Sequence, residues 1–138
     1  MKAVVQRVSS AAVRVEGATV SEIGPGLLVL LGVAKDDGMA EVEHMSRKLI
    51  GLRVFPDSNG RMSENLGERE ILCVSQFTLC GDTSKGNRPG FVAAAAPEVA
   101  EPLYRLVCEK INARRGVFGA DMKVAMVGDG PVTVLIEV

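Results

Sequence analysis

A polar group of residues interrupts an apolar stretch near the middle of the chain. The apolar residues ILCV lead directly into Ser75, Gln76, Phe77 and Thr78. In an extended strand, successive side chains alternate between the two faces, so Gln76 and Thr78 would share one of them. Two interpretations fit this pattern. Either the polar side chains are solvated at a sheet edge, or the strand ends in a pocket wall where hydroxyl and backbone N–H groups meet a ligand.

A second stretch that could do chemistry is GDGPVTV, residues 128–134. Gly130 places no side chain in the way, and Pro131 fixes its own backbone torsion, so the pair is rigid. One interpretation is a simple hairpin turn between two strands. The other is that the pair presents backbone carbonyl groups to a ligand at fixed positions.

Conventional catalytic and cofactor sites find little support. The one histidine, His44, falls on the border between the polar and apolar sides of a predicted helix, which favours a solvated or structural role. Cys73, Cys80 and Cys108 lie in apolar surroundings, which indicates reduced core thiols rather than a zinc site. No phosphate-binding loop or dinucleotide fingerprint occurs. If the protein is an enzyme, we expect it to need no metal, no cofactor and no conventional base.

The composition is that of an ordinary globular protein. The chain has 138 residues, of which 47% are hydrophobic and 24% charged, and we expect one domain over residues 1–138. The formal charge of −1 excludes nucleic-acid binding through overall charge but leaves room for a local basic patch. The apolar run at residues 27–33 is too short to span a membrane, and the N-terminus lacks the pattern of a signal peptide. We therefore expect a soluble, cytoplasmic protein.

The hydrophobic periodicity predicts an α+β fold with a mostly antiparallel sheet. Strands are expected over residues 27–34, 52–55, 70–79, 123–127 and 132–138, and residues 2–8 and 11–15 form either two strands or one long bent strand. Amphipathic helices are expected over residues 38–51 and 98–114, with Pro102 either starting or kinking the second. A polar loop at residues 81–90 follows the strand that carries the polar group.

Taken together, the two motifs carry a resemblance to a known family. The chain resembles the D-aminoacyl-tRNA deacylases, whose motifs read S-Q-F-T and N-x-G-P-[VF]-T. It has Ser75-Gln76-Phe77-Thr78 and GPVT at residues 130–133, and its N-terminal MKAVVQRVSSAAVRVEG, its NRPGF loop and its C-terminal tail also look like the family. Gly128 stands where the family usually has Asn. Both residue types tolerate a positive φ, so the turn could persist without the asparagine hydrogen bond.

The resemblance implies a homodimer that hydrolyses the ester joining a D-amino acid, or misattached glycine, to the 3′ end of tRNA. It implies a partly closed β-barrel with two helices packed outside and active sites at the dimer interface. The pocket for the aminoacyl-adenosine end would be lined by the catalytic residues Ser75, Gln76, Phe77 and Thr78. A cis Gly130-Pro131 peptide, inserted from the other subunit, would reject L-amino acids sterically.

Thr78 has no histidine or carboxylate beside it in either motif, so a nucleophilic threonine would lack a base. We therefore expect the ribose 2′-hydroxyl of the substrate to orient or activate water. Backbone N–H groups near Phe77 and Thr78 would then stabilise the oxyanion. We expect Arg7 to brace the Gly-Pro segment by holding its backbone carbonyls.

The tRNA body should rest on basic residues near the pocket, and the candidates are Lys85, Arg88, Lys110, Arg114 and Arg115. Two other functions are weighed against the deacylase. One is a non-catalytic RNA- or adenosine-binding module, and the other is a small-molecule esterase unrelated to tRNA. The intact motifs argue against the first, and the missing nucleophile–base pair argues against the second.

Overall fold

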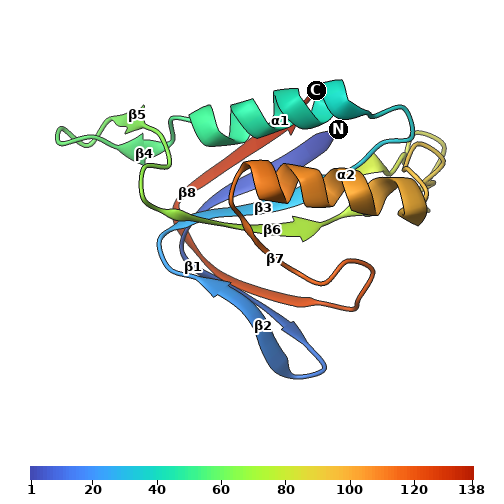
Figure 1. Ribbon diagram of the computed structural model, residues 1–138, viewed down its shortest axis with the longest axis horizontal. Helices are drawn as coiled ribbons and strands as arrows, with labels where there is room; N and C mark the ends of the chain where they lie inside the picture. Colours follow the sequence, from blue (N-terminus) through green and yellow to red (C-terminus); the bar gives the residue numbers. More distant parts are fainter.

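The computed structural model describes residues 1–138 and shows a curled mixed sheet with two helices against it (Figure 1). The main sheet contains β1 (Lys2–Val15), β2 (Ala18–Ile23), β3 (Gly26–Gly32), β6 (Glu70–Ser75), β7 (Arg114–Arg115) and β8 (Lys123–Glu137). The helices are α1 (Met39–Gly51) and α2 (Pro97–Lys110), and β4 (Phe55–Pro56) pairs with β5 (Met62–Glu64) in a small separate sheet. A single 3₁₀ turn, η1 (Phe77–Cys80), follows β6.

Strand β1 is the centre of the sheet. It pairs antiparallel with β3 through its first half, with β2 through its second half, and with β8 along most of its length. Strand β6 runs parallel to β3 and to β7. Because β1 bends between two partners on one side, the sheet curls into a nearly closed barrel. The predicted α+β fold with a partly closed barrel and two helices is therefore confirmed, and β1 is the single long bent strand.

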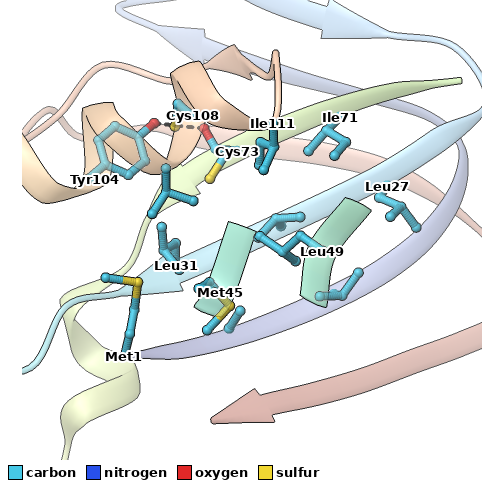
Figure 2. Packing of buried hydrophobic residues seen from close by; sticks show 14 of the residues in the cluster. Met1, Leu27, Leu31, Met45, Leu49, Ile71, Cys73, Tyr104, Cys108 and Ile111 are labelled. Atoms are coloured by element: carbon cyan, nitrogen blue, oxygen red, sulfur yellow. Dashed lines mark hydrogen bonds between the residues drawn. The ribbon is translucent and has the colours of Figure 1, made fainter. Parts of the chain in front are cut away.

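Two apolar clusters hold this arrangement. The larger one lies between the helices and the sheet, where Leu27 and Leu31 of β3 pack near Met45 and Leu49 of α1 (Figure 2). The smaller one includes Leu28 and belongs to the interior of the curled sheet. Both faces of β3 are thus covered, which explains its almost unbroken apolar sequence.

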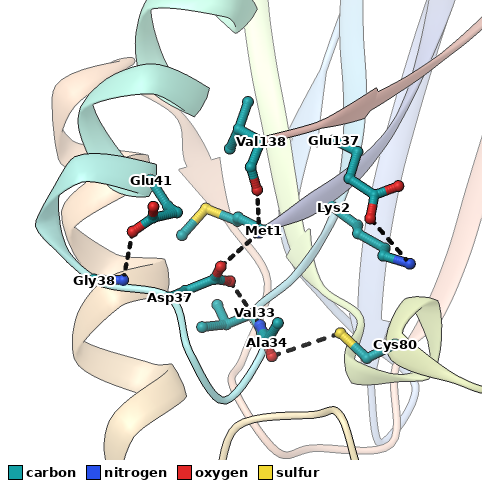
Figure 3. A network of polar contacts seen from close by, with 10 residues as sticks. All are labelled: Met1, Lys2, Val33, Ala34, Asp37, Gly38, Glu41, Cys80, Glu137 and Val138. Atoms are coloured by element: carbon teal, nitrogen blue, oxygen red, sulfur yellow. Dashed lines mark hydrogen bonds and ion pairs between the residues drawn. The ribbon is translucent and has the colours of Figure 1, made fainter.

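A polar network ties the two ends of the chain together (Figure 3). The ammonium group of Met1 donates to Asp37 Oδ1 at 2.6 Å and to the Val138 carbonyl at 2.8 Å. Asp37 Oδ2 accepts from the Ala34 backbone N–H at 2.6 Å. The thiol of Cys80 contacts the Val33 carbonyl at 3.7 Å, which connects η1 to the end of β3. These contacts fix the segment between β3 and α1 against the ends of β1 and β8.

Several predicted boundaries were wrong. The strand expected over 70–79 ends at Ser75, because the chain turns at Gln76 into the 3₁₀ turn. The second helix ends at Lys110 rather than at 114, because Asn112 takes a positive φ of 48° and leads the chain into β7. The strand expected over 52–55 begins only at Phe55.

The two final strands are one element. Strand β8 runs continuously from Lys123 to Glu137, so the Gly-Pro pair makes no hairpin turn. Strand β2 was not predicted, because its exposed sequence lacks an apolar signal. No helix of the structure is long and apolar enough to cross a membrane.

Candidate functional site

The polar group sits where β6 leaves the sheet. The ladder with β3 ends when the Gln76 backbone N–H donates to the Leu31 carbonyl at 2.8 Å. The 3₁₀ turn then closes through Leu79 N–H to the Gln76 carbonyl at 3.2 Å. The backbone N–H groups of Phe77 and Thr78 stand at the start of this turn, where no earlier carbonyl can reach them, and neither has an acceptor in the protein. Two adjacent donors are therefore free.

Gln76 and Thr78 place two polar side chains at this turn, and neither is a base. Gln76 Nε2 donates to Thr78 Oγ1 at 2.5 Å, which orients the threonine hydroxyl. Gln76 and Thr78 do not share a strand face as predicted, because only Ser75 of the motif belongs to β6. Phe77 is 56% exposed. No group of three or more His, Cys, Asp or Glu side chains comes together anywhere in the chain, and His44 is exposed on α1.

A cavity of about 610 Å³ opens beside this turn. It is mostly apolar and is lined from the motif by Ser75, Gln76 and Phe77. Its other walls come from the ends of β3 and β6, the 91–104 segment and the 118–124 segment: Leu31, Val33, Val74, Phe91, Ala94, Ala95, Pro97, Ala100, Tyr104, Phe118, Gly119, Ala120, Asp121, Met122 and Val124. The cavity is large enough to hold an apolar or aromatic group next to the free N–H donors.

A buried tyrosine anchors the cavity wall to β6. The hydroxyl of Tyr104 donates to the Cys73 carbonyl at 2.8 Å, as Figure 2 shows. Burial raises the pKa of Tyr104 far above its usual range, so the hydroxyl stays protonated and keeps this bond. A hydrogen bond with Cys108 and burial raise the pKa of the Cys73 thiol, and all three cysteines are free and buried. Burial also raises the pKa of the Cys80 thiol, so Cys73 and Cys80 are core groups that stay protonated.

The Gly-Pro segment forms a wide bulge in β8. Gln6 pairs with Thr133 and Val8 with Gly128, so residues 129–132 of β8 stand opposite the single residue Arg7. The Gly130–Pro131 peptide bond is cis, and Gly130 has a φ of +124°. The sequence between the two pairing points is therefore pushed out of the ladder.

Arg7 lies under this bulge. Its Nε donates to the Asp129 carbonyl and also lies 3.1 Å from Asp129 Oδ2. Its Nη1 donates to the Val54 carbonyl at 2.6 Å, and only 11% of the side chain is exposed. One guanidinium group thus connects the bulge to the segment after α1. Next to it, Thr133 Oγ1 donates to Gln6 Oε1 at 2.7 Å.

Gly128 behaves differently from the expectation. It is paired with Val8 in the ladder and has no positive φ, so the tolerance of glycine for that region is not what keeps the segment in place. A Cβ atom at Gly128 would meet nothing within 4 Å, so an asparagine would also fit there. The contacts made by Arg7 hold the bulge instead.

The two motifs lie apart within one chain. No residue of 128–134 is among those that line the cavity beside Ser75, Gln76 and Phe77. Gly130 lies instead next to Arg7, since a Cβ on it would come within 3.1 Å of Arg7 Nη2. The chain therefore presents the cavity and the Gly-Pro bulge as two separate features.

The predicted basic residues fall into two groups. Lys110 forms an ion pair with Glu43 at 2.6 Å, and Arg114 pairs with Glu70 at 2.7 Å and lowers the pKa of that carboxyl. The other three are exposed and form no ion pair: Lys85, Arg88 and Arg115. Arg114 and Arg115 belong to β7 and not to the end of a helix as predicted.

Sequence analysis gave no role to several residues of the cavity, notably Phe91, Phe118 and Tyr104. Phe91 ends the NRPGF loop and Phe118 lies at the start of the C-terminal tail, and the family resemblance covers both segments without giving either residue a role. Periodicity could not find Phe91 and Phe118, because both lie outside the helices and strands and reach the cavity only in the folded chain. The one sequence signal for such a role is that Phe91 is an apolar residue directly after the polar loop 81–90.

Comparison with known proteins identifies the family to which this chain is similar. The family model described as D-Tyr-tRNA(Tyr) deacylase matches residues 4–137. A D-aminoacyl-tRNA deacylase of Myxococcus xanthus is 54% identical, with 99% of this chain and 94% of that protein covered. A protein of the same description from Porphyromonas gingivalis is 48% identical over 99% of this chain and 97% of its own length.

Two solved structures share the fold of this chain. A protein described as c-Myc DNA Unwinding Element Binding Protein superimposes with a TM-score of 0.95 at 45% identity, covering 100% of this chain and 99% of that one. A protein described as a probable eukaryotic D-amino acid tRNA deacylase superimposes with a TM-score of 0.85 over 99% and 98% of the two chains. Its 17% identity to this chain bears on the fold alone.

The family model and these relatives thus place the chain among hydrolases that act on aminoacyl-tRNA. The chain belongs to the D-aminoacyl-tRNA deacylase family. The predictions of the family and of a hydrolase are confirmed.

The contacts of Arg7 give a first prediction. In Arg7→Lys, a single ammonium group cannot reach both the Asp129 and the Val54 carbonyls, so one charge-assisted bond is lost. We expect amide hydrogen exchange of residues 128–132 to become roughly tenfold faster, measured by mass spectrometry, since a bond of about 1.5 kcal/mol corresponds to that factor. Arg14→Lys, at an exposed position of the same strand, is the control and should leave the exchange unchanged. Equal protection in Arg7→Lys and the parent would contradict the bracing role.

Proposed function

We propose that this protein hydrolyses the ester between a D-amino acid, or misattached glycine, and the 3′ end of tRNA. The products are the free amino acid and tRNA. The observation that carries the proposal is the pair of free backbone N–H groups of Phe77 and Thr78 beside the apolar cavity. Two such donors are what a tetrahedral intermediate of ester hydrolysis requires. We further propose that residues 1–138 act as one domain, in the cytoplasm and without a cofactor.

The chemistry rests on position and polarisation. Water attacks the ester carbonyl, and the carbonyl oxygen gains negative charge next to the N–H groups of Phe77 and Thr78. The bond to the ribose 3′-oxygen then breaks, and that oxygen leaves with a proton. No side chain of the turn is a base, so the adjacent ribose 2′-hydroxyl orients and activates the water. Ser75 and Gln76 complete the wall that holds the aminoacyl-adenosine end.

A homodimer joins the two separated motifs. Because Gly130 and Pro131 do not line the cavity of their own chain, we propose that they enter the cavity of a second copy. The surface of β8 supports such an interface, since Val124, Met126, Val127 and Leu135 are exposed large apolar residues along one strand. Covering them would remove an apolar surface from water.

Within that dimer, the Gly-Pro bulge would act as a chiral filter. Arg7 holds the bulge through the Asp129 carbonyl, and the Gly130 and Pro131 carbonyls would occupy the space that the side chain of an L-amino acid needs. Because exclusion is steric, the side chain of a D-amino acid needs no specific contact. Glycine, which has no side chain, passes in the same way.

The direct test is deacylation of matched D- and L-tyrosyl-tRNA, with glycyl-tRNA as a third substrate. We expect rapid release of D-tyrosine and of glycine, and release of L-tyrosine no faster than without protein. Binding of the D-substrate without hydrolysis would instead indicate a non-catalytic RNA-binding module. Equal hydrolysis of a simple D-tyrosine ester would indicate an esterase unrelated to tRNA.

The source of the nucleophile is tested by two changes. Replacing the terminal adenosine of D-tyrosyl-tRNA by 2′-deoxyadenosine should reduce single-turnover hydrolysis at least a hundredfold, the lower range for a lost acid–base group. Thr78→Ala should keep activity within about tenfold, because the backbone N–H of residue 78 remains. His44→Gln, on the exposed face of α1, is the control and should match the parent. A nucleophilic threonine would reverse the pattern, with Thr78→Ala inactive and the 2′-deoxy substrate still cleaved.

Gly130→Ala tests the filter. The added Cβ would lie 2.9 Å from Val132 Cγ2 and 3.1 Å from Arg7 Nη2, at a φ of +124° that L-residues rarely adopt. The bulge must therefore move, and we expect the ratio of D to L deacylation rates to fall at least tenfold. Gly128→Ala, whose Cβ meets nothing within 4 Å, is the matched control. An unaltered ratio in Gly130→Ala would place the filter elsewhere.

Subunit mixing then tests the shared site. If a Gly130→Ala chain and a chain with a disabled Ser75–Thr78 turn form a mixed dimer, one of its two sites carries neither change. We expect that mixture to recover activity and D/L discrimination that neither parent variant has. Mixed dimers that stay defective would show that each site is built within one chain.

Lys85 and Arg88 are the favoured contacts for the tRNA body, together with Arg115, because Lys110 and Arg114 are already neutralised by glutamates. Lys85→Gln with Arg88→Gln should weaken tRNA binding and lower the slope of log K against log salt by about 0.7 to 0.9 per lost phosphate contact. The control replaces Arg47 and Lys48, which are exposed on α1. The same slope in both double variants would exclude the 81–90 loop.

A further inference from the structure

The backbone N–H of Phe77 is one of the two proposed oxyanion donors, but few contacts within its own turn hold this residue in place. It opens a single 3₁₀ turn of four residues, a short element with weaker hydrogen-bond geometry than an α-helix. Phe77 is 56% exposed, so its ring is not packed in the main core. Something other than the core must restrict the backbone of this turn, because free N–H groups stabilise an oxyanion only when they are held in place.

The ring of Phe91 provides that contact. Its centroid lies 5.1 Å from that of Phe77 at an interplanar angle of 69°, an edge-to-face arrangement that aromatic pairs favour. The same ring covers the other end of the turn, since a Cβ on Gly81 would come within 3.1 Å of Phe91 Cε1. Phe91 therefore touches both ends of the segment 77–81.

Phe91 is itself fixed by the loop that precedes it. Asp82 and Gly90 exchange two backbone hydrogen bonds of 2.8 and 2.9 Å, which close the polar loop and place residue 91 back beside the turn. The Phe91 carbonyl accepts from the Ala94 N–H at 3.0 Å, which joins it to the segment before α2. Although Phe91 is 36% exposed, its backbone is held on both sides, so its ring can restrain a neighbour as a ring on a free loop could not.

We propose that Phe91 is a positioning residue, which orders the 77–81 turn through the Phe77 ring and so keeps the two free N–H groups aimed at the reacting carbonyl. Phe91 also lines the cavity, but the proposed role is its action through Phe77, so its loss should appear in kcat more than in KM. The proposal rests on the proposed function for its kinetic readout. It also predicts a structural effect on Phe77 that does not depend on any activity.

Kinetics of Phe91→Leu, Phe91→Tyr and Val92→Ala on D-tyrosyl-tRNA test the proposal. Leucine keeps apolar bulk but lacks the aromatic edge, so we expect kcat to fall about three- to tenfold with KM changed less than twofold, as the worth of an aromatic pair implies. Phe91→Tyr should restore kcat to within twofold. Val92, which is 88% exposed and does not line the cavity, is the matched neighbour and should be silent. An unchanged kcat, or a rise in KM alone, would overturn the proposal.

The activity-independent readout is ¹⁹F NMR of protein that contains fluorinated phenylalanine at its four Phe positions, with Phe77 assigned from Phe77→Leu. In Phe91→Leu, the Phe77 resonance should move toward the free amino acid and sharpen, and in Val92→Ala it should stay. If the parent fails to deacylate the D-substrate, the proposed function fails and this spectrum alone decides whether Phe91 orders Phe77. An unchanged Phe77 resonance in Phe91→Leu would contradict the positioning role, even if the enzyme is active.

Discussion

The continuous pairing of β1 with three strands is the constraint on which the rest of the structure depends. Its first half fixes β3, and β3 in turn fixes the parallel strand β6, whose end is the polar turn. On its other edge, β1 fixes β8, and the register shift opposite Arg7, one of two in this ladder, is where the Gly-Pro segment is pushed out. Both candidate parts of the active site are therefore placed by the register of one strand.

The proposed chemistry of the site relies on backbone groups more than on side chains. A strand that leaves a sheet exposes N–H groups that the ladder no longer satisfies, and a short 3₁₀ turn leaves its first donors free. Here these donors belong to Phe77, which lines the apolar cavity, and to its neighbour Thr78. An electrostatic interaction beside such a cavity is stronger than in water. Such a site needs no ionisable residue with a shifted pKa, which fits a chain whose one histidine is exposed.

The Gly-Pro bulge is supported in a similar way. A guanidinium group has several donors in a fixed plane, so Arg7 can hold the Asp129 and Val54 carbonyls at once. This links the bulge to the segment after α1 and leaves its outer side bare. In the proposed dimer, that outer side is what the other subunit receives, so rigidity on one face and openness on the other serve the same purpose.

The sequence by itself determined the two motifs, the long helices, the buried β3 strand and the absence of a conventional nucleophile–base pair. These features are local patterns of residue type and spacing, so they can be recognised directly from the sequence. Only the tertiary structure decided that β6 ends at Ser75, that residues 123–137 form one strand, and that Arg114 and Arg115 lie on β7. Each of these depends on a partner distant in sequence. The Leu31 carbonyl accepts the last hydrogen bond of the β6 ladder, β1 pairs with β8 on both sides of the bulge, and β6 pairs with β7. The contact between Phe77 and Phe91 is of the same kind, because the closed 82–90 loop brings together two rings that no sequence pattern connects.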